Sequence, residues 1–194
     1  MPPRVKITKE EIVQATLDLM RKQGDDALNA RAIASALNCS TQPVFSNFAT
    51  MELLKASVVE SAYECYLDFL RREAESGRYP RYKAFGMAYI RFAEEEKELF
   101  KLLFMRDRTQ EEKVLSLDFE ESVQMIMHAN GLTKERATRM HLETWACVHG
   151  IAVMIATSFL SFDWEMISDM LSDVYQGVRA RHLEEEKEHA RNSN

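Results

Sequence analysis

Apolar residues recur every three or four positions along most of this chain, which is the spacing of one face of an α-helix. No segment convincingly shows the alternation of apolar and polar residues that indicates a strand. The first helical pattern passes through Ile12 and Met20. Thr8 and Glu11 have the spacing of a capping box at its start, and Gly24 suits its end. The pattern predicts an all-α protein.

Residues 29–48 predict two short helices joined by a tight turn. Asn29 can cap the first helix, because its side-chain oxygen can accept from the free amide hydrogens of the first turn. Ile33 and Ala34 then give that helix an apolar side. Asn38 lies where the chain must turn, and asparagine tolerates the left-handed conformation better than other residues with a Cβ atom.

The second short helix is predicted to have a polar, uncharged outer face. Ser40 is the expected cap, and Pro43 fits the first turn, where amide hydrogens have no helical partner. We expect apolar contacts from Val44, Phe45 and Phe48. The outward positions are Thr41, Gln42, Ser46 and Asn47. This is the layout of a helix-turn-helix, whose second helix enters the major groove of DNA.

The chain after residue 50 continues as helices with their own start and stop signals. A second capping box is formed by Thr109 and Glu112, and Gly77 and Gly131 are expected to end helices. The expected helices run from about Thr50 to Ser76, from Pro80 to the charged run 94–98, from Leu99 to Met105, from Thr109 to Gly131, from Thr133 through residues 145–162, and from Asp163 to about Lys187. We expect a helix-turn-helix DNA-binding domain over residues 1–50, a helical ligand-binding and dimerisation domain over 51–187, and a disordered tail over 188–194.

The chain up to Leu54 resembles the N-terminal DNA-binding domain of TetR/AcrR-type transcriptional regulators. Phe45 stands where that family usually has tyrosine, Asn38 where glycine is frequent, and Met51 where lysine is usual. The first and last changes remove a hydroxyl and a charge, which weakens the expected contacts with the DNA backbone. The resemblance is carried by the opening helix through Met20 and by Arg31, Ile33, Ala34, Ser40, Phe45, Asn47, Phe48, Leu53 and Leu54.

The resemblance implies a cytoplasmic homodimer that represses transcription by binding a pseudo-palindromic operator in double-stranded DNA. A small apolar molecule, the effector, would release it. Two recognition helices about 34 Å apart would meet successive faces of the major groove. Two other hypotheses stay open, a DNA-binding helical dimer that no small molecule controls and an all-helical enzyme. Gln42→Ala separates the two DNA-binding hypotheses from the enzyme, because it should weaken DNA binding and leave any catalysis untouched.

The polar face and the resemblance together select the candidate DNA-binding residues. Gln42 is the best candidate for base recognition, because its amide can pair in two ways with adenine. Arg4, Lys6, Arg31 and Lys55 would attract phosphates. No Arg or Lys lies in the second helix or the turn before it, which predicts modest affinity and weak salt dependence per half-site. The full set is Arg4, Lys6, Arg31, Ser40, Thr41, Gln42, Phe45, Ser46, Asn47 and Lys55.

A formal net charge of −6 at first argues against nucleic acid as a partner. The acidic residues are unevenly distributed. Residues 1–55 hold seven Lys or Arg and six Asp or Glu, whereas the rest of the chain holds eighteen and twenty-five. An acidic body can coexist with a locally basic contact face, so DNA remains the expected partner.

Aromatic and methionine side chains of the middle helices could line a pocket, because ligand pockets are mostly apolar with a few polar groups. A stripe of such residues is more often plain core, so both interpretations stay open. Trp145, His149 and Gly150 form a W-x-x-x-H-G pattern that resembles the ligand domain of a TetR subgroup named after those letters. His149 is either buried and bonded to backbone, or a polar group at the pocket wall or the dimer interface. The candidate ligand-binding residues are Phe85, Met87, Phe92, Phe104, Met125, Trp145 and His149.

The last two long helices are the most apolar pair and are the expected dimer interface. Gly150, Ala152 and Ala156 allow close approach of helices. Two such helices from each subunit would form a four-helix bundle. The alternative is a monomer that buries these helices within itself.

Other functions find little support in the sequence. Residues 145–162 contain no Asp, Glu, Lys or Arg, yet their glycine, histidine and hydroxyl residues favour a buried helix over a membrane span. The charged start of the chain does not predict a secretory signal. No nucleophile, phosphate loop or paired-carboxylate motif predicts an enzyme.

Cysteine and histidine spacing predicts neither a metal site nor a cofactor site. Cys39, Cys65 and Cys147 are far apart and read as reduced thiols, with Cys39 a minor candidate for redox sensing because it lies in the predicted turn. His128, His141 and His149 are spread over two predicted helices and lack the tight spacing of metal ligands.

Overall fold

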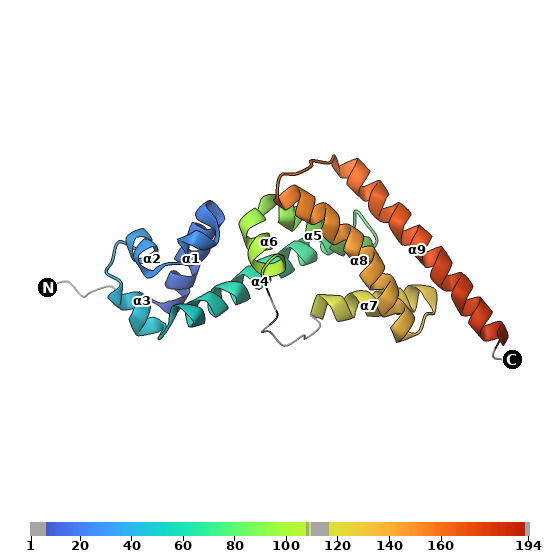
Figure 1. Ribbon diagram of the computed structural model, residues 1–194, viewed down its shortest axis with the longest axis horizontal. Coiled ribbons are helices and arrows are strands. Elements are labelled where there is room, and N and C mark those ends of the chain that lie inside the picture. The colour runs from blue at the N-terminus through green and yellow to red at the C-terminus, as the bar shows by residue number, and fades with distance from the viewer. Residues whose placement is uncertain (1–6, 108, 110–116, 193–194) are drawn as a thin grey trace. The chain divides into compact units, whose positions relative to one another are not determined.

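The computed structural model describes residues 7–107, 109 and 117–192, and over these ranges the chain is helical without any strand (Figure 1). The predicted all-α class is therefore confirmed. The elements in chain order are α1 (Lys9–Gln23), the 3₁₀ turn η1 (Gly24–Ala27), α2 (Ala30–Ala36), α3 (Gln42–Asn47), α4 (Met51–Glu75), α5 (Arg81–Glu95), α6 (Lys97–Phe104), α7 (Leu117–Asn130), α8 (Lys134–Ala156) and α9 (Trp164–Asn192).

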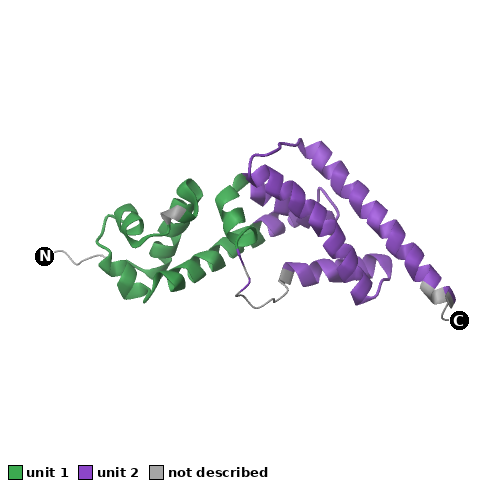
Figure 2. Ribbon diagram, viewed as in Figure 1, with its two compact units in different colours: residues 1–68, 95–106 green, residues 69–94, 107–194 purple. Residues whose placement is uncertain are grey.

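The helices form two compact units (Figure 2). Unit 1 comprises residues 1–68 and 95–106, and unit 2 comprises residues 69–94 and 107–194. Helix α4 begins at Met51, where we expected a domain to start, but unit 1 continues through most of α4 and includes α6. The sequence pattern did not reveal this, because α6 joins unit 1 only through packing.

One expectation about the end of the chain also changes. Helix α9 continues to Asn192, so residues 188–192 are helical where we expected a disordered tail. Ion pairs support this end of the helix, since Arg181 bonds Glu185 one turn later on the same helix. Of the expected capping box of Thr109 and Glu112, Glu112 lies outside the described residues, and α7 is described from Leu117.

In unit 1, α1 begins and ends at the expected signals. Thr8 Oγ1 accepts from the Glu11 amide at 3.1 Å, and Glu11 Oε2 accepts from the Thr8 amide at 2.8 Å, which completes the capping box. Gly24 ends the helix with a φ of 71°. Completely or almost completely buried side chains form the core of this unit, among them Ile12, Met20, Ile33, Val44, Leu54 and Val58.

The turn between α2 and α3 follows the prediction. Asn29 caps α2, with Oδ1 accepting from the Ala32 amide at 2.8 Å. Asn38 takes the left-handed conformation, with a φ of 50°. The cap of α3 is Thr41 and not Ser40, and no side chain bonds the free amides there. A cap at Ser40 would aim at the position of Pro43, which has no amide hydrogen.

Unit 2 combines α5, α7, α8 and α9. A core of buried residues joins α7 and α8, and α9 runs back along α8 (Figure 1). Gly86 of α5 allows close packing, because a Cβ at this position would lie 3.0 Å from Leu171 Cδ2 and 3.4 Å from Val148 Cγ2. The expected caps Thr133 and Asp163 accept from the amides of Arg136 and Met166. The buried core consists of Val123, Ile126, Leu132, Ala137 and Met140.

The apolar stretch 145–162 does not form one continuous helix. Helix α8 ends at Ala156, and Ser158 takes a left-handed conformation, with a φ of 56°, in the turn before α9. Among the described residues, no helix is long and apolar enough to cross a membrane.

Candidate functional site

Helix α3 presents Gln42 at its first position. This side chain is exposed, and it has no hydrogen-bond partner among the described residues. Thr41 precedes it, half-buried, and its hydroxyl makes no capping bond. In a helix-turn-helix the first residues of the recognition helix meet the base edges. Thr41 and Gln42 therefore lie at the end of α3 that would meet base edges, and both side chains are free to bind a partner there.

The last turn of α3 differs from the expectation. The Asn47 amide nitrogen donates to Pro43 O at 2.8 Å and to Ile7 O at 3.3 Å, and the side chain is partly buried. Ser46 is exposed, but its hydroxyl also donates to Pro43 O, at 3.1 Å. We expected Asn47 to face outward. It instead bonds the backbone, because Pro43 O and Ile7 O both lie within its reach.

Phe45 was expected to pack inward and is 51% exposed. Val44 and Phe48, four positions apart, occupy the inward face of α3, and Phe45 points about 100° away from Val44. Leu53, in the first turn of α4, is likewise 55% exposed. Unit 1 therefore exposes two large apolar side chains close in sequence to the polar face.

The candidate basic residues have different environments. Arg31 and the neutral candidate Ser40 are exposed. Lys55 Nζ lies 3.1 Å from both carboxylate oxygens of Asp25, an exposed pair that is weak in water. Arg4 and Lys6 lie outside the described residues. The described part of the interface therefore carries little free positive charge.

The sequence did not identify how α6 is held in unit 1. Arg21 of α1 donates from Nε to both oxygens of Glu96, at 3.1 and 2.9 Å, and this contact raises the pKa of Arg21. Glu98 Oε2 would lie 2.9 Å from a Cβ added at Gly24. Glu96 and Glu98 belong to the charged run 94–98 of the sequence, but their partners can be identified only in the folded structure.

The seven candidate ligand-binding residues do not share one environment. Phe104 belongs to unit 1, where its ring packs edge-on against Tyr66. Met87 and Phe92 of unit 2 are completely buried, as core residues are. Phe85 and Met125 are half-buried. These environments favour the core interpretation for Met87 and Phe92.

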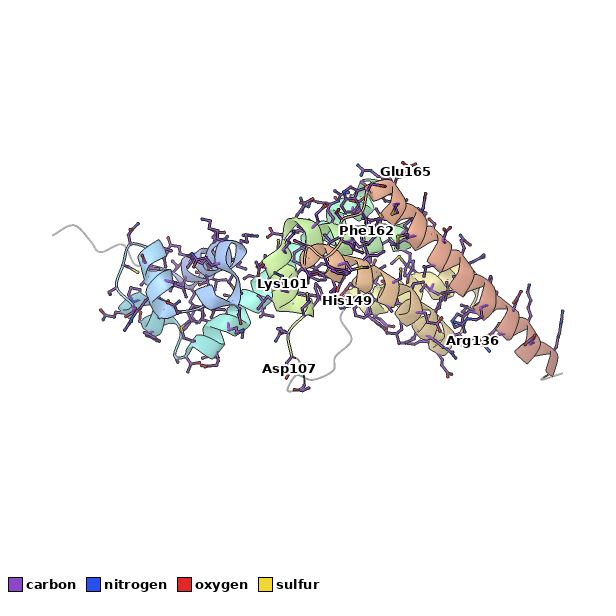
Figure 3. The ribbon with its side chains drawn as sticks, turned by 45° about the horizontal axis from the view of Figure 1, so that its top comes forward. Lys101, Asp107, Arg136, His149, Phe162 and Glu165 are labelled. Carbon is purple, nitrogen blue, oxygen red and sulfur yellow. The ribbon has the colours of Figure 1, made fainter. Side chains whose placement is uncertain are left out.

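Trp145 and His149 form a partly open polar and aromatic cluster on α8, where Figure 3 labels His149. Their rings stack with centroids 4.8 Å apart, and Trp145 is 38% exposed. His149 Nδ1 lies 2.9 Å from the hydroxyl of Tyr89 on α5. Burial lowers the pKa of His149 and raises that of Tyr89, so both groups are neutral near pH 7. The partner of His149 Nδ1 is thus a tyrosine hydroxyl, which the sequence did not identify.

A second tyrosine–histidine pair lies two turns earlier on α5, and the sequence analysis missed it. The Tyr82 hydroxyl lies 2.9 Å from His141 Nδ1 and 2.6 Å from Thr144 Oγ1. Burial lowers the pKa of His141 to about 4. The signal in the sequence was the spacing, since Tyr82 and Tyr89 lie about two turns apart on α5, as their histidine partners do on α8.

Metal and thiol chemistry gain no support. Within the described ranges, no cluster of three or more histidine, cysteine or acidic side chains could hold a metal ion. The three cysteines are half-buried and free. Burial raises the pKa of Cys65 and of Cys147, which disfavours the reactive thiolate at both positions.

The packing of α5 against α7, α8 and α9 defines a helical body attached to a helix-turn-helix. Residues 82–187, more than half of the chain, match the family described as "Tetracyclin repressor-like, C-terminal domain". The chain therefore belongs to the TetR family of transcriptional regulators, as the resemblance implied. The finer resemblance to the W-x-x-x-H-G subgroup stays a prediction.

Solved structures agree at the level of the fold. A TetR-like transcriptional regulator from Rhodococcus sp. RHA1 is similar with a TM-score of 0.62 and 13% identity, over 94% of this chain and 98% of that chain. A TetR family member from Streptomyces coelicolor A3 is similar with a TM-score of 0.58 and 14% identity, over 86% of this chain and 96% of that chain. No curated protein matches.

Proposed function

We propose that this chain is a homodimeric transcriptional repressor that binds a pseudo-palindromic operator through α3 and leaves it when a small molecule binds unit 2. The observation that carries the proposal is the free Gln42 side chain at the first position of α3. An amide in that position can donate to N7 and accept from N6 of adenine. Thr41, Ser40 and the exposed Phe45 would surround it at the groove.

Phosphate contacts supply the rest of the affinity. Arg31 is exposed, and Lys55 is held only by a weak surface pair, so both charges can turn toward phosphates. Arg4 and Lys6 add two further charges from the start of the chain. With all four contacts made, the slope of log K against log salt would be about −3.6 per half-site, a stronger salt dependence than the absence of Arg and Lys from α3 alone predicts.

Dimerisation through α8 and α9 fits the exposed apolar residues of these helices. Leu142 of α8 and Met166 of α9 are 47% and 49% exposed in the single chain. A two-fold interface would bury the same patch on both subunits. It would also pair two recognition helices for two operator half-sites.

The cluster of Trp145, His149 and Tyr89 supports effector binding in unit 2. It combines a partly open indole with two neutral hydrogen-bonding groups, the mixture that ligand sites use. The effector we propose is small and mainly apolar. It releases DNA only to the extent that it binds one state of the dimer more tightly than the other.

The second candidate is a DNA-binding dimer without small-molecule control. The complete burial of Met87 and Phe92 favours it, because two of the expected pocket residues are core. Both candidates require DNA binding, so that property is tested first.

The test is selection from randomised duplex DNA with the full chain, followed by sequencing of the bound fraction. We expect an enriched inverted repeat, and a loss of binding of about 10-fold or more for Gln42→Ala, since one bidentate base contact is worth about 1–3 kcal/mol. Gln14→Ala is the matched control, because Gln14 is an exposed glutamine of α1 that bonds Asp18 on the same helix. Absence of any enriched sequence at low salt would contradict the proposal.

A further inference from the structure

Phe45 places an apolar ring on the polar, outward face of α3. Val44 and Phe48 occupy the inward face of the helix and are 0% and 6% exposed, whereas Phe45 is 51% exposed. Residues three or four apart on a helix share a face, so both Phe45 and Ser46 lie beside Gln42. The exposed ring therefore adjoins the amide that the proposed function assigns to a base.

The ring of Phe45 contributes little to the core of unit 1. Within the described part of the chain it makes no ring-stacking or cation–π contact, whereas Lys9 Nζ lies 5.5 Å from the ring centroid of Phe48. A half-exposed ring also stabilises the fold less than a buried one, because less apolar surface is removed from water. Substitution of Phe45 should therefore change the surface of α3 and leave unit 1 folded.

The chemistry of the ring limits what it can recognise on DNA. A phenyl ring has no hydrogen-bond donor and no charge, so it does not bond a phosphate or the polar atoms of a base edge. The apolar group that the major groove presents is the C5-methyl of thymine, and phenylalanine is one of the side chains that contact it. The ring is therefore suited to thymine.

The spacing on α3 determines how far this thymine lies from the adenine of Gln42. The Cβ atoms of Gln42 and Phe45, three positions apart on one helix, are separated by about 5–6 Å. Successive base pairs are about 3.4 Å apart along the duplex. Phe45 should therefore meet a base pair about one or two steps from the pair that Gln42 contacts.

We propose that Phe45 recognises the C5-methyl group of a thymine that lies about one or two base pairs from the adenine paired with Gln42. The inference rests on the proposed DNA-binding function and adds a second base to it. The two side chains discriminate by different means, Gln42 through hydrogen bonds and Phe45 through an apolar contact. At the position that Phe45 contacts, thymine should be preferred to cytosine and to uracil.

The experiment replaces the thymines of one selected half-site, one at a time, by deoxyuridine, which pairs in the same way and lacks only the methyl group. At one position the wild type should bind about 4-fold more weakly, the effect of leaving one apolar carbon in water. Phe45→Ala should bind the two operators equally, within about 1.5-fold. Gln42→Ala should keep the difference of about 4-fold, because it removes only the contact with adenine.

A second series of operators tests the methyl group in a different base pair. Cytosine paired with guanine at the same position should weaken binding by the wild type. The base 5-methylcytosine should then recover about 4-fold in affinity, because it restores a methyl group at C5. Phe45→Ala should bind the two cytosine operators equally.

Two further variants separate methyl recognition from a general loss of apolar surface. Leu53→Ala is the matched control, since Leu53 of α4 is a 55% exposed apolar residue, and it should leave the deoxyuridine difference unchanged. Phe45→Ser places a residue typical of exposed positions in α3 and should lose the difference, as Phe45→Ala does. Thermal unfolding shows which variants are folded at the assay temperature.

A deoxyuridine difference of the same size in the wild type and in folded Phe45→Ala would overturn this inference alone, because another group would then contact the methyl. A wild type that tolerates deoxyuridine at every position of the half-site would also overturn it. If the wild type enriches no sequence in the selection, the proposed function fails, and this inference fails with it.

Discussion

Side chains stabilise the two units in different ways. In unit 1, Thr8, Asn29 and Asn47 bond backbone groups at the ends of helices, and most of these bonds span three or four residues. In unit 2, Tyr82 and Tyr89 bond histidines about 60 residues away, on α8. The local bonds fix where a helix begins or ends, whereas the tyrosine–histidine bonds join two helices, α5 and α8.

The largest effect that tests this comparison is loss of a core ring in unit 2. Phe92 is completely buried, and its ring packs edge-on against Phe69 with centroids 5.3 Å apart. Phe92→Ala should lower the free energy of unfolding of unit 2 by about 3–5 kcal/mol, because it removes a buried ring and leaves a cavity.

Tryptophan fluorescence during denaturant unfolding measures this effect, because both tryptophans of the chain, Trp145 and Trp164, lie in unit 2. Phe85→Ala is the matched control, since Phe85 is only half-buried. A loss below about 1 kcal/mol for Phe92→Ala would contradict the core assignment and return Phe92 to the candidate ligand site.

A smaller effect should follow from the buried histidine of unit 2. The pKa of His141 falls from 6.5 to about 4 because burial disfavours its charged form, although Asp118 partly opposes this. Between pH 6.5 and 4 the unfolded chain therefore binds a proton at this residue that the folded chain does not. The contribution of His141 to the free energy of unfolding should therefore be constant above pH 6.5. It should decrease by up to about 3 kcal/mol as the pH falls to 4.

Unfolding of the wild type and of His141→Gln, followed by tryptophan fluorescence between pH 7 and 4.5, isolates this contribution. The difference in stability between the two proteins should change across the window. His128→Ala, at an exposed histidine, is the control variant. A difference that stays constant with pH would show that His141 titrates normally in the folded protein.

The same comparison explains how much could be predicted from the sequence. Local signals predicted the caps at Thr8 and Asn29 and the turn at Asn38, since each acts on backbone within a few residues. Ser40 failed as a cap because Pro43 removes the amide that such a cap bonds.

Contacts between distant residues could not be predicted in this way. The bonds of Asn47 to Ile7 and of Arg21 to Glu96 depend on how helices pack, and no spacing in the chain identifies the partners. The sequence shows that the tyrosines of α5 and the histidines of α8 are each about two turns apart, but it does not show which tyrosine bonds which histidine. The outward position expected for Gln42 agrees with its exposure, whereas the one expected for Asn47 does not, because Asn47 bonds a distant carbonyl. The DNA-binding role of both residues stays a prediction.

The smallest effect tests the local bonds of unit 1. Asn29→Ala removes the cap that the Ala32 amide uses, and it should cost about 1 kcal/mol. Because the bond is local, the loss should be confined to unit 1. Hydrogen exchange of the amides in α2 should become about 5-fold faster, while the tryptophan transition of unit 2 stays in place. Asn29→Asp is the control, since aspartate is an equally good cap and should preserve the protection. If the tryptophan transition moved together with α2, the two units would unfold as one, and the cap would contribute to the stability of the whole chain.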